Sequence, residues 1–337
     1  MFSTIYVEQA VRETPRVQKI LQRFDALPIV SIEQYGEIFN RNNQNFRLQK
    51  QKPALILAEK HGNKVLPTPE GYGFEHLPGV GGGKGKGKGF YFSHMLNCVY
   101  DCRYCFLQGM YRSANYVLFV NYEDFAAEIG ARAEATGDGS VFYSGYDCDS
   151  LALEPVSGFC DFFLPFFGSL PGTRLEIRTK STQVRFFLER EPMANSIIAM
   201  SFSPQSVAES LEHKVPSVAK RIDALQRLQQ AGWPVALRFE PVIADTDVLA
   251  QYRQLFEQIF NSIDPALVQS CSLGEFRLPQ EYYKRMVKLY PTEPLLARET
   301  RRTDGMVSLA SAEANLVQEL EALLFHYINR ESYYRCA

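Results

Sequence analysis

The chain has 337 residues, enough for one large or two modest domains with a substantial core. Hydrophobic residues make up 46% and charged residues 22%, which excludes a wholly disordered chain. The 36 Lys and Arg residues nearly balance the 38 Asp and Glu residues, giving a net charge of −2. The net charge therefore does not indicate electrostatic DNA binding by the protein surface as a whole, although the composition allows a local basic surface.

The cysteine count and the apolar segments indicate the compartment. Seven cysteines, an odd number with three of them clustered, do not resemble a disulfide framework and are typical of a reducing cytosol. The first residues lack a basic region followed by an apolar core, so we expect no secretion signal. The most apolar segment, 159–167, is too short to span a bilayer and contains Asp161 and Pro165, which favours a buried helix. The sequence predicts a cytoplasmic protein with no membrane partner.

The first predicted unit covers residues 1–80 and contains an apolar strand at 53–58. A glycine–lysine run at 81–89 follows, and its many glycines favour a mobile loop or linker. We expect its three lysines to be solvated rather than bound to phosphates. The second predicted unit comprises residues 81–337.

From residue 90 onward, predicted strands alternate with predicted helices. Asn121 is expected to cap a helix that begins near Tyr122, with Asp124 as its partner, and Ser217 to cap a helix that ends at Gly232. Another helix is predicted over 249–263. The expected strands are 90–92, 141–144, 175–180, 196–202, 235–239 and 267–273. Such β-then-α units with right-handed crossovers predict an α/β fold, a partial (β/α)6 TIM-like barrel with an N-terminal extension and a C-terminal helical segment. Active groups then belong at the C-terminal ends of the strands.

Three cysteines, Cys98, Cys102 and Cys105, form a Cys-x3-Cys-x2-Cys motif, and the next cysteine is Cys148. Three thiolates can hold three irons of a [4Fe–4S] cluster and leave the fourth iron open, whereas a ferredoxin closes that corner with a fourth cysteine. The open iron can chelate S-adenosyl-L-methionine through its amino and carboxylate groups. One electron from the cluster into the sulfonium would release a 5′-deoxyadenosyl radical. In this motif the chain resembles the radical S-adenosylmethionine (radical SAM) superfamily.

A structural zinc site is the alternative interpretation of the same cysteines. His94 precedes Cys98 by four residues, so His94 and the three cysteines could form a Cys3His tetrahedron. Zinc knuckles usually pair their ligands as two short clips with a longer spacer, whereas here all four lie within residues 94–105. The spacing favours the cluster, and a zinc-containing nucleic-acid-binding protein is the alternative from a different functional class.

Beyond the cysteines, the chain resembles the spore photoproduct lyase family, a DNA photolyase-like group, over most of its length. The matching segments are 105–108, 116–121, 178–180, 201–204, 221–225, 238–243 and 272–277. In that family the adenosyl radical abstracts hydrogen from a methylene-bridged thymine dimer in DNA, which then fragments to two thymines. The resemblance implies a DNA repair-type lyase that acts on a damaged or modified nucleic-acid base. It also implies DNA or another nucleic acid as partner and an electron donor such as flavodoxin or ferredoxin.

The resemblance also assigns cofactor-binding residues. Lys180 matches the lysine that meets the carboxylate of S-adenosylmethionine, and Ser201 matches a serine that lines the same cofactor. Tyr104, inside the cysteine motif, would pack on the adenine. The structural alternatives are a solvated strand-end charge for Lys180, a buried hydroxyl bonded to backbone for Ser201, and simple loop packing for Tyr104.

The chain departs from the family at two positions. The Tyr that follows the third cluster cysteine is Phe106 here, and the position of the hydrogen-donor cysteine aligns with Tyr146. If this segment is extended, Tyr146 and Cys148 project to one face, roughly 6.5 Å apart. We expect Cys148 or Tyr146 to be the redox-active group, and the alternative for Cys148 is a small buried hydrophobe. The departures leave open strict spore photoproduct lyase activity or radical modification of RNA, a peptide or a small metabolite.

Weaker candidates lie elsewhere in the chain. Cys160, Cys271 and Cys336 are expected to be packing or surface thiols. Glu240, at a strand end, would either point into the barrel or be satisfied by Arg238 or water. A modest basic–aromatic patch is predicted near the C-terminus, either as a site for nucleic-acid phosphates or as a charged surface; its members are Tyr290, Arg298, Arg301 and Arg302.

Overall fold

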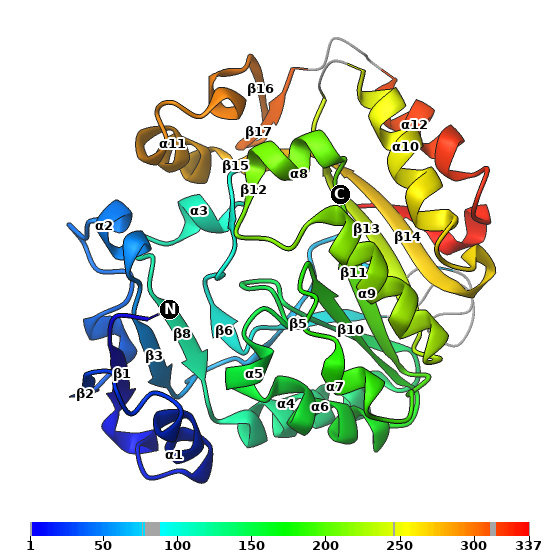
Figure 1. Cartoon of the computed structure of the whole chain (residues 1–337). Coiled ribbons are helices and arrows are strands. Elements are labelled where there is room, and N and C mark those ends of the chain that lie inside the picture. The colour runs from blue at the N-terminus through cyan, green and yellow to red at the C-terminus, as the bar shows by residue number, and fades with distance from the viewer. Residues whose placement is uncertain (1, 76, 78–87, 245–246, 311–314, 337) are drawn as a thin grey trace.

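The structure, a computed structural model, describes residues 2–75, 77, 88–244, 247–310 and 315–336. Of the linker expected at 81–89, residues 81–87 lie outside the described residues. None of the described helices has the length and apolar character needed to cross a bilayer. Figure 1 shows an α/β architecture in which a curled sheet is covered by helices on its outer side.

In the described part of the chain, the central sheet has eight strands in the order β18-β14-β13-β11-β10-β9-β5-β4. Its inner strands all run parallel and match the six predicted strands; they are β5 (Gly89–Phe92), β9 (Ser140–Ser144), β10 (Thr173–Thr179), β11 (Ser196–Ser201), β13 (Val235–Val242) and β14 (Val268–Glu275). Antiparallel β4 (Val65–Pro67) and parallel β18 (Tyr333–Arg335) form the edges. This parallel order confirms the predicted partial (β/α)6 barrel, and most positions of β9, β10, β11, β13 and β14 are buried, as parallel strands require.

Amphipathic helices cover the outer face of this half-barrel; they are α4 (Tyr122–Thr136), α6 (Phe159–Gly168), α7 (Arg185–Leu188), α9 (Val218–Gln230), α10 (Val248–Phe260) and α12 (Leu316–Leu324). The apolar segment at 159–167 is the buried helix α6, which packs on β10 and β11. Ser217 caps α9 as predicted, accepting a hydrogen bond from the backbone N–H of Lys220 at 3.4 Å. Helix α4 begins where predicted, but the Asn121 side chain bonds Asp124 and the backbone of Lys60 instead of capping its own helix.

The N-terminal segment builds a second sheet in the order β2-β1-β3-β8-β6. Its strands are β1 (Ile5–Glu8), β2 (Ile29–Ile32), β3 (Leu55–Ala58), β6 (Met95–Leu96) and β8 (Tyr116–Phe119), joined by α1 (Pro15–Gln22) and α2 (Phe46–Gln51). Strand β3 pairs in parallel with β8, which comes from beyond residue 80. Hydrogen bonding therefore crosses the expected boundary near residue 80, and the boundary itself stays a prediction.

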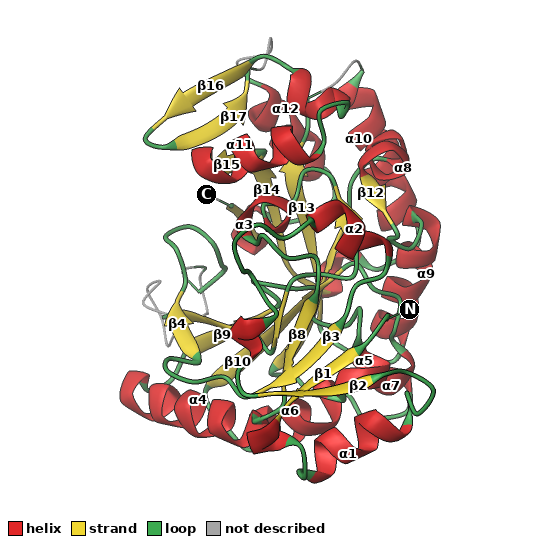
Figure 2. Ribbon diagram, turned by 90° about the vertical axis from the view of Figure 1, so that its left-hand side faces the viewer, coloured by secondary structure: helices red, strands yellow, loops and turns green. Residues whose placement is uncertain are grey.

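Short elements gather at the C-terminal ends of the central strands. They are β7 (Asp101–Cys102), α3 (Leu107–Met110), α5 (Glu154–Ser157), α8 (Gln205–Leu211), β12 (Glu212–His213), β15 (Arg277–Pro279), α11 (Gln280–Leu289), β16 (Thr300–Thr303) and β17 (Met306–Leu309). Helix α11 packs on α3, and β15, β17 and β16 form a separate antiparallel sheet. Figure 2 shows the β16–β17 hairpin projecting at one end of the molecule. This is the end at which a barrel of this kind places its active groups.

Candidate active site

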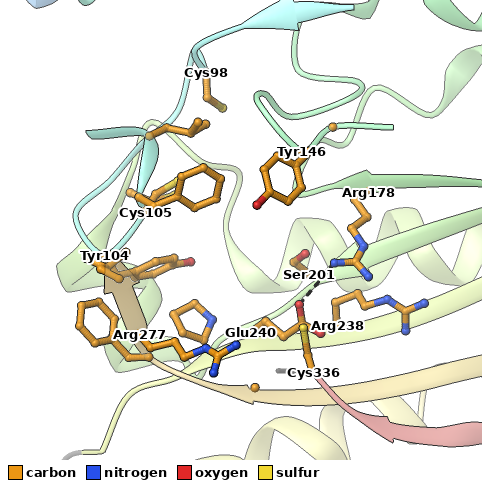
Figure 3. A pocket seen from close by; sticks show the side chains of 18 of the residues that line it. Cys98, Tyr104, Cys105, Tyr146, Arg178, Ser201, Arg238, Glu240, Arg277 and Cys336 are labelled. Carbon is orange, nitrogen blue, oxygen red and sulfur yellow. Dashed lines mark ion pairs between the residues drawn. The ribbon is translucent and has the colours of Figure 1, made fainter. Parts of the chain in front are cut away.

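A cavity of about 530 Å³ lies at the C-terminal ends of the central strands. All eight residues predicted to carry function line it: Cys98, Cys102, Tyr104, Cys105, Tyr146, Cys148, Lys180 and Ser201. Figure 3 shows the cysteine loop with Tyr104 on one side of the cavity, Arg178 and Arg238 on the opposite side, and Tyr146 between them. The fold thus brings together residues that the sequence separates by about a hundred positions.

The cysteine loop is fixed at both ends by backbone and side-chain hydrogen bonds. Asn97, in the left-handed region with φ of 73°, donates from Nδ2 to the carbonyls of Ser113 and Asn115 at 2.9 and 3.1 Å. Strand β7 pairs antiparallel with β12, so that Cys102 lies opposite Glu212. The next residue, Arg103, donates its backbone N–H to the carbonyl of Leu211 at 2.8 Å. The loop is therefore held as a defined strand-and-turn.

The three thiols suit a multi-iron cluster better than a single ion. Among the described residues, no three His, Cys, Asp or Glu side chains are arranged to hold one metal ion. A cluster instead offers each thiolate its own iron. Burial raises the pKa of Cys98 to about 12 and also raises the pKa of Cys102 and Cys105, so a bound cationic metal is what would keep them as thiolates.

His94, the fourth ligand of the zinc alternative, faces the hydrophobic core. Its ring is completely buried and lies 4.5 Å from the ring of Phe159, between centroids. Neither ring nitrogen has a hydrogen-bond partner within the described chain, and burial lowers the pKa of His94 to about 3. His94 is not among the residues that line the cavity with the cysteines, so it is not placed to be the nitrogen ligand of a Cys3His zinc site.

Lys180 follows directly after β10 and is positioned through Asp149. One carboxylate oxygen of Asp149 accepts the backbone N–H of Lys180 at 2.6 Å, and the other accepts the Thr179 hydroxyl at 2.8 Å. The Lys180 ammonium lies 5.5 Å from the centre of the Tyr104 ring. Burial alone would lower the pKa of Lys180, but the charges of Glu212 and Cys102 raise it above its ordinary value. Lys180 therefore presents a positive charge beside the cysteine loop.

A buried ion pair holds Tyr104 and Ser201 in place. Arg221 donates from Nη2 to Glu212 at 2.6 Å and from Nη1 to the carbonyl of Ser201 at 2.9 Å. The other oxygen of Glu212 accepts the hydroxyl of Tyr104 and that of Ser203, the latter at 3.1 Å. No local sequence pattern selects Glu212 or Asp149, although each carboxylate anchors a predicted site residue.

The opposite wall contains a second charged network that includes Glu240, which lines the cavity in agreement with the first of its two expected placements. Arg238 pairs with Glu176 at 2.7 Å, not with Glu240. Glu240 instead accepts the Ser272 hydroxyl and forms an ion pair with Arg178, in which Nη1 and Oε2 are 3.5 Å apart (Figure 3). Arg178 also contacts Glu176 at 2.7 Å. Two arginines and two carboxylates thus neutralise one another along the strand ends.

Tyr146 and Cys148 lie in different surroundings, because the chain turns after β9. Gly145 has a φ of 85°, so the expected extended geometry across these residues is wrong. The Tyr146 ring stacks on Tyr91 with centroids 4.3 Å apart and lies 5.6 Å from Phe106, and burial raises the pKa of Tyr146 to about 12. Cys148 is 5% exposed and packs in the core of the N-terminal sheet while still lining the cavity.

Cys336 also lines the cavity, whereas Cys160 and Cys271 are buried packing residues as expected. The backbone N–H of Cys336 donates to the carbonyl of Leu273 at 2.8 Å, and the Cys336 sulfur lies 3.8 Å from the carbonyl oxygen of Tyr72. A Cβ atom on Gly274 would lie 3.2 Å from Cβ of Cys336 and 3.2 Å from Cγ of Glu240, so this glycine allows their close approach. No local sequence signal indicated that Cys336 belongs to the site.

The predicted basic–aromatic patch is divided in the structure. Arg301 and Arg302 are exposed on β16, in the sheet whose neighbouring strands contribute Arg277 and Met306 to the cavity wall. The Tyr290 ring instead stacks under the guanidinium of Arg103, with Cζ 4.0 Å from the ring centre.

A protein-family model described as "Spore photoproduct lyase" matches residues 91–307, well over half of the chain. The chain belongs to the spore photoproduct lyase family. Its relatives include the spore photoproduct lyase of Clostridium acetobutylicum, 21% identical over 59% of either chain. Another is that of Bacillus subtilis, 24% identical over 61% of either chain. The aligned part is thus about three fifths of the length of these curated relatives.

Solved structures of spore photoproduct lyase share the fold. A mutant with bound AdoMet and dinucleoside spore photoproduct superposes with a TM-score of 0.80 at 15% identity, covering 100% of this chain and 98% of that chain. A spore photoproduct lyase complexed with dinucleoside spore photoproduct gives the same TM-score and coverage at 14% identity. The fold of the spore photoproduct lyase family therefore extends over this whole chain.

Proposed function

We propose that this protein is a radical SAM enzyme that acts on a damaged or modified nucleic-acid base. The observation that carries the proposal is the convergence of the three cysteines, Lys180 and Ser201 on one cavity. When bound, a [4Fe–4S] cluster and S-adenosyl-L-methionine would together supply a 5′-deoxyadenosyl radical by reductive cleavage of the sulfonium. Cys98, Cys102 and Cys105 would hold the cluster. The seven cysteines, none in a disulfide among the described residues, support the expected cytoplasmic location.

The residues around the cluster bind and orient the cofactor. Lys180 offers its ammonium to the cofactor's carboxylate, and the Asp149 contact fixes the direction from which it approaches. Tyr104 and Ser201 line the adenosyl side, held by Arg221 and Glu212. Tyr146 or Cys148 is the predicted redox-active group: either could give the hydrogen atom of its O–H or S–H to a carbon radical, which would leave an oxygen or sulfur radical on the side chain.

The substrate assignment rests on the family and on the half of the cavity around Tyr146. The solved relatives are described with dinucleoside spore photoproduct bound, and rings such as Tyr146 in this cavity offer stacking faces for a base. Phe106 and Tyr146, where the family has Tyr and Cys, favour a second candidate, radical modification of RNA, a peptide or a small metabolite. DNA repair and this second reaction share every step up to substrate binding.

Anaerobic reconstitution tests the reaction class. The expected result is a brown protein with about four irons per chain that forms 5′-deoxyadenosine from S-adenosyl-L-methionine under dithionite. Replacing Cys102 with Ala should remove both iron and cleavage, whereas Cys271→Ala, in the core away from the cavity, should keep them. One zinc per chain without cofactor cleavage would refute the proposal. Incubation with dinucleoside spore photoproduct then distinguishes the two candidate functions. Loss of the lesion supports repair, whereas cleavage of S-adenosyl-L-methionine without loss of the lesion supports the second candidate.

A further inference from the structure

A second cavity, of about 240 Å³, lies beside the cysteine loop and is strongly basic. We call it the basic pocket; its lining residues are Phe46, Arg47, Lys50, Gln51, Asp101, Arg103, Lys214 and Tyr290. Four cationic side chains line it with one carboxylate, Asp101, and a second carboxylate, Glu293, approaches Arg103 at 3.9 Å, so positive charge remains in excess. Such a surplus of positive charge around a recess attracts an anionic group.

The cysteine loop is the wall between the two cavities. Cys102 and Tyr104 line the active-site cavity, whereas Asp101 and Arg103 line the basic pocket. For Asp101 and Cys102 this follows from the extended backbone of β7, in which successive side chains point to opposite faces; Arg103 and Tyr104 lie in the turn that follows. The basic pocket therefore lies against the same loop as the Cys102 thiol, on the face that carries Asp101 and Arg103.

The cations of the basic pocket are held in place and remain incompletely neutralised. Lys50 donates to Asp101 and Gln108 at 2.5 Å each and to the Tyr290 hydroxyl at 2.9 Å. Burial lowers the pKa of Lys50. The positive charges of Arg103 and Lys214 lower it further, whereas the negative charge of Asp101 raises it. Arg103 stacks on Tyr290 and approaches Asp101 at 3.4 Å and Glu293 at 3.9 Å, and its Nη1 is buried with no hydrogen-bond partner among the described residues. A carboxylate brought to exposed Arg47 and Lys214 would relieve the repulsion among these cations.

We propose that the basic pocket is the docking site for an acidic one-electron carrier protein that reduces the cluster. The inference rests on the proposed function, because it gives that function its electron source. One electron leaves the reduced centre of the carrier and enters the cluster behind Cys102. The carrier is oxidised by one electron, the cluster is reduced by one, and no bond or proton changes.

The position of the pocket favours a protein carrier over nucleic acid. A carrier has to approach the cluster from the side that the substrate does not use, and the basic pocket meets this condition. Exposed Arg47 and Lys214 form its rim, where charges steer an acidic partner and give a salt-sensitive encounter. A compact recess of this size accepts a carboxylate side chain, and small, weak interfaces are typical of electron-transfer complexes.

The test uses reconstituted holoenzyme with a bacterial flavodoxin as the probe. The charge reversals Arg47→Glu and Lys214→Glu, combined, should raise the flavodoxin Kd measured by calorimetry about tenfold or more at low salt. They should raise the KM for flavodoxin in 5′-deoxyadenosine formation by a similar factor. The same variant should keep the dithionite-driven rate, because dithionite needs no docking site. The control variant Lys220→Glu/Arg253→Glu reverses two exposed cations on outer helices α9 and α10 and should bind flavodoxin as the wild type does.

The outcomes separate the two proposals. An unchanged flavodoxin Kd in the double variant would overturn the docking site even if cleavage with dithionite is intact. Failure of the wild type to form 5′-deoxyadenosine with dithionite would count against the proposed function, while the calorimetric comparison would still decide the docking site. Weaker binding of duplex DNA with unchanged flavodoxin affinity would assign the pocket to nucleic acid and overturn the inference. Because Arg47 also donates to the Leu289 carbonyl at 2.9 Å, Lys214→Glu alone serves as the second variant and should show the same direction.

Discussion

The Glu212–Arg221 ion pair should be the most stabilising electrostatic contact near the cofactor side of the cavity. The two side chains are 1% and 0% exposed, and Nη2 of Arg221 lies 2.6 Å from Oε2 of Glu212. Glu212→Gln keeps the shape of the side chain but leaves Arg221 as a buried charge without its counter-ion. Breaking a buried pair in this way costs about 3–5 kcal/mol of unfolding free energy. Because the Gln carbonyl can still accept from Tyr104, we expect the lower end, roughly 3 kcal/mol.

A double-mutant cycle isolates the pair from its surroundings. Arg221→Met should also destabilise, since it leaves the Glu212 carboxylate buried and unpaired, whereas Glu212→Gln/Arg221→Met removes both charges. The double variant should therefore lose less than the sum of the two single losses, by about 2–3 kcal/mol. Urea unfolding can be followed by the fluorescence of Trp233, the only tryptophan, whose buried indole N–H donates to the Phe187 carbonyl at 2.9 Å. Coincident circular dichroism checks the two-state assumption. Additive losses within about 0.5 kcal/mol would refute the assignment of a coupled buried pair.

Other substitutions probe packing, thiol chemistry and pH. Gly109→Ala would place a Cβ 2.3 Å from the backbone oxygen of Tyr282, so it should displace α11 from α3 and cost about 1–3 kcal/mol in urea unfolding; a loss below the measurement error would contradict this packing. Cys148→Ala should lower the unfolding free energy by about 1 kcal/mol, because it hollows the N-terminal core, and Cys336→Ala should change it less; the reverse order would contradict the burial pattern. Burial raises the pKa of Glu154 from 4.5 to about 7. The folded state therefore keeps this proton to higher pH than the unfolded chain, and Glu154 makes stability fall by roughly 3 kcal/mol as the pH rises from 4.5 to 7. Glu154→Gln should remove that fall in unfolding curves taken across this pH range, and an unchanged pH profile would show that Glu154 titrates normally.

The sequence sufficed for the central sheet and the cysteine loop because both signals are local. Parallel strands buried on both faces appear as continuous apolar runs, and the run at 196–201 contains one of them. The cysteine motif is likewise a local spacing within a single loop. Its match to the family then selected Lys180 and Ser201, which the structure places at the same cavity.

The features that the sequence did not reveal depend on contacts between distant segments. Cys336 reaches the cavity only because β18 pairs with β14, and the basic pocket joins side chains from residues 47, 103, 214 and 290. No periodicity connects such positions. The spacing of Tyr146 and Cys148 was misjudged for a different reason: one glycine, Gly145, takes a positive φ and ends the strand early. A rule based on alternation fails wherever a turn interrupts the strand.

The two halves of the cavity, one beside the cysteine loop and one around Tyr146, are built in physically different ways. This difference would allow the substrate to change while the proposed cofactor cleavage is kept. Beside the cysteine loop, Lys180 and Tyr104 are fixed by the half-buried carboxylate of Asp149 and the buried carboxylate of Glu212, an arrangement that tolerates little change. Around Tyr146, contacts are mostly between rings, with centroids 5.3 Å from Tyr72 and 5.6 Å from Phe106. Ring contacts are less directional than charged hydrogen bonds, so we expect this half to accept a different planar substrate without disturbing Lys180 and Tyr104. A family member with Phe106 and Tyr146 can therefore keep cofactor cleavage while its substrate diverges, and measuring 5′-deoxyadenosine and lesion loss in the same reaction distinguishes the two.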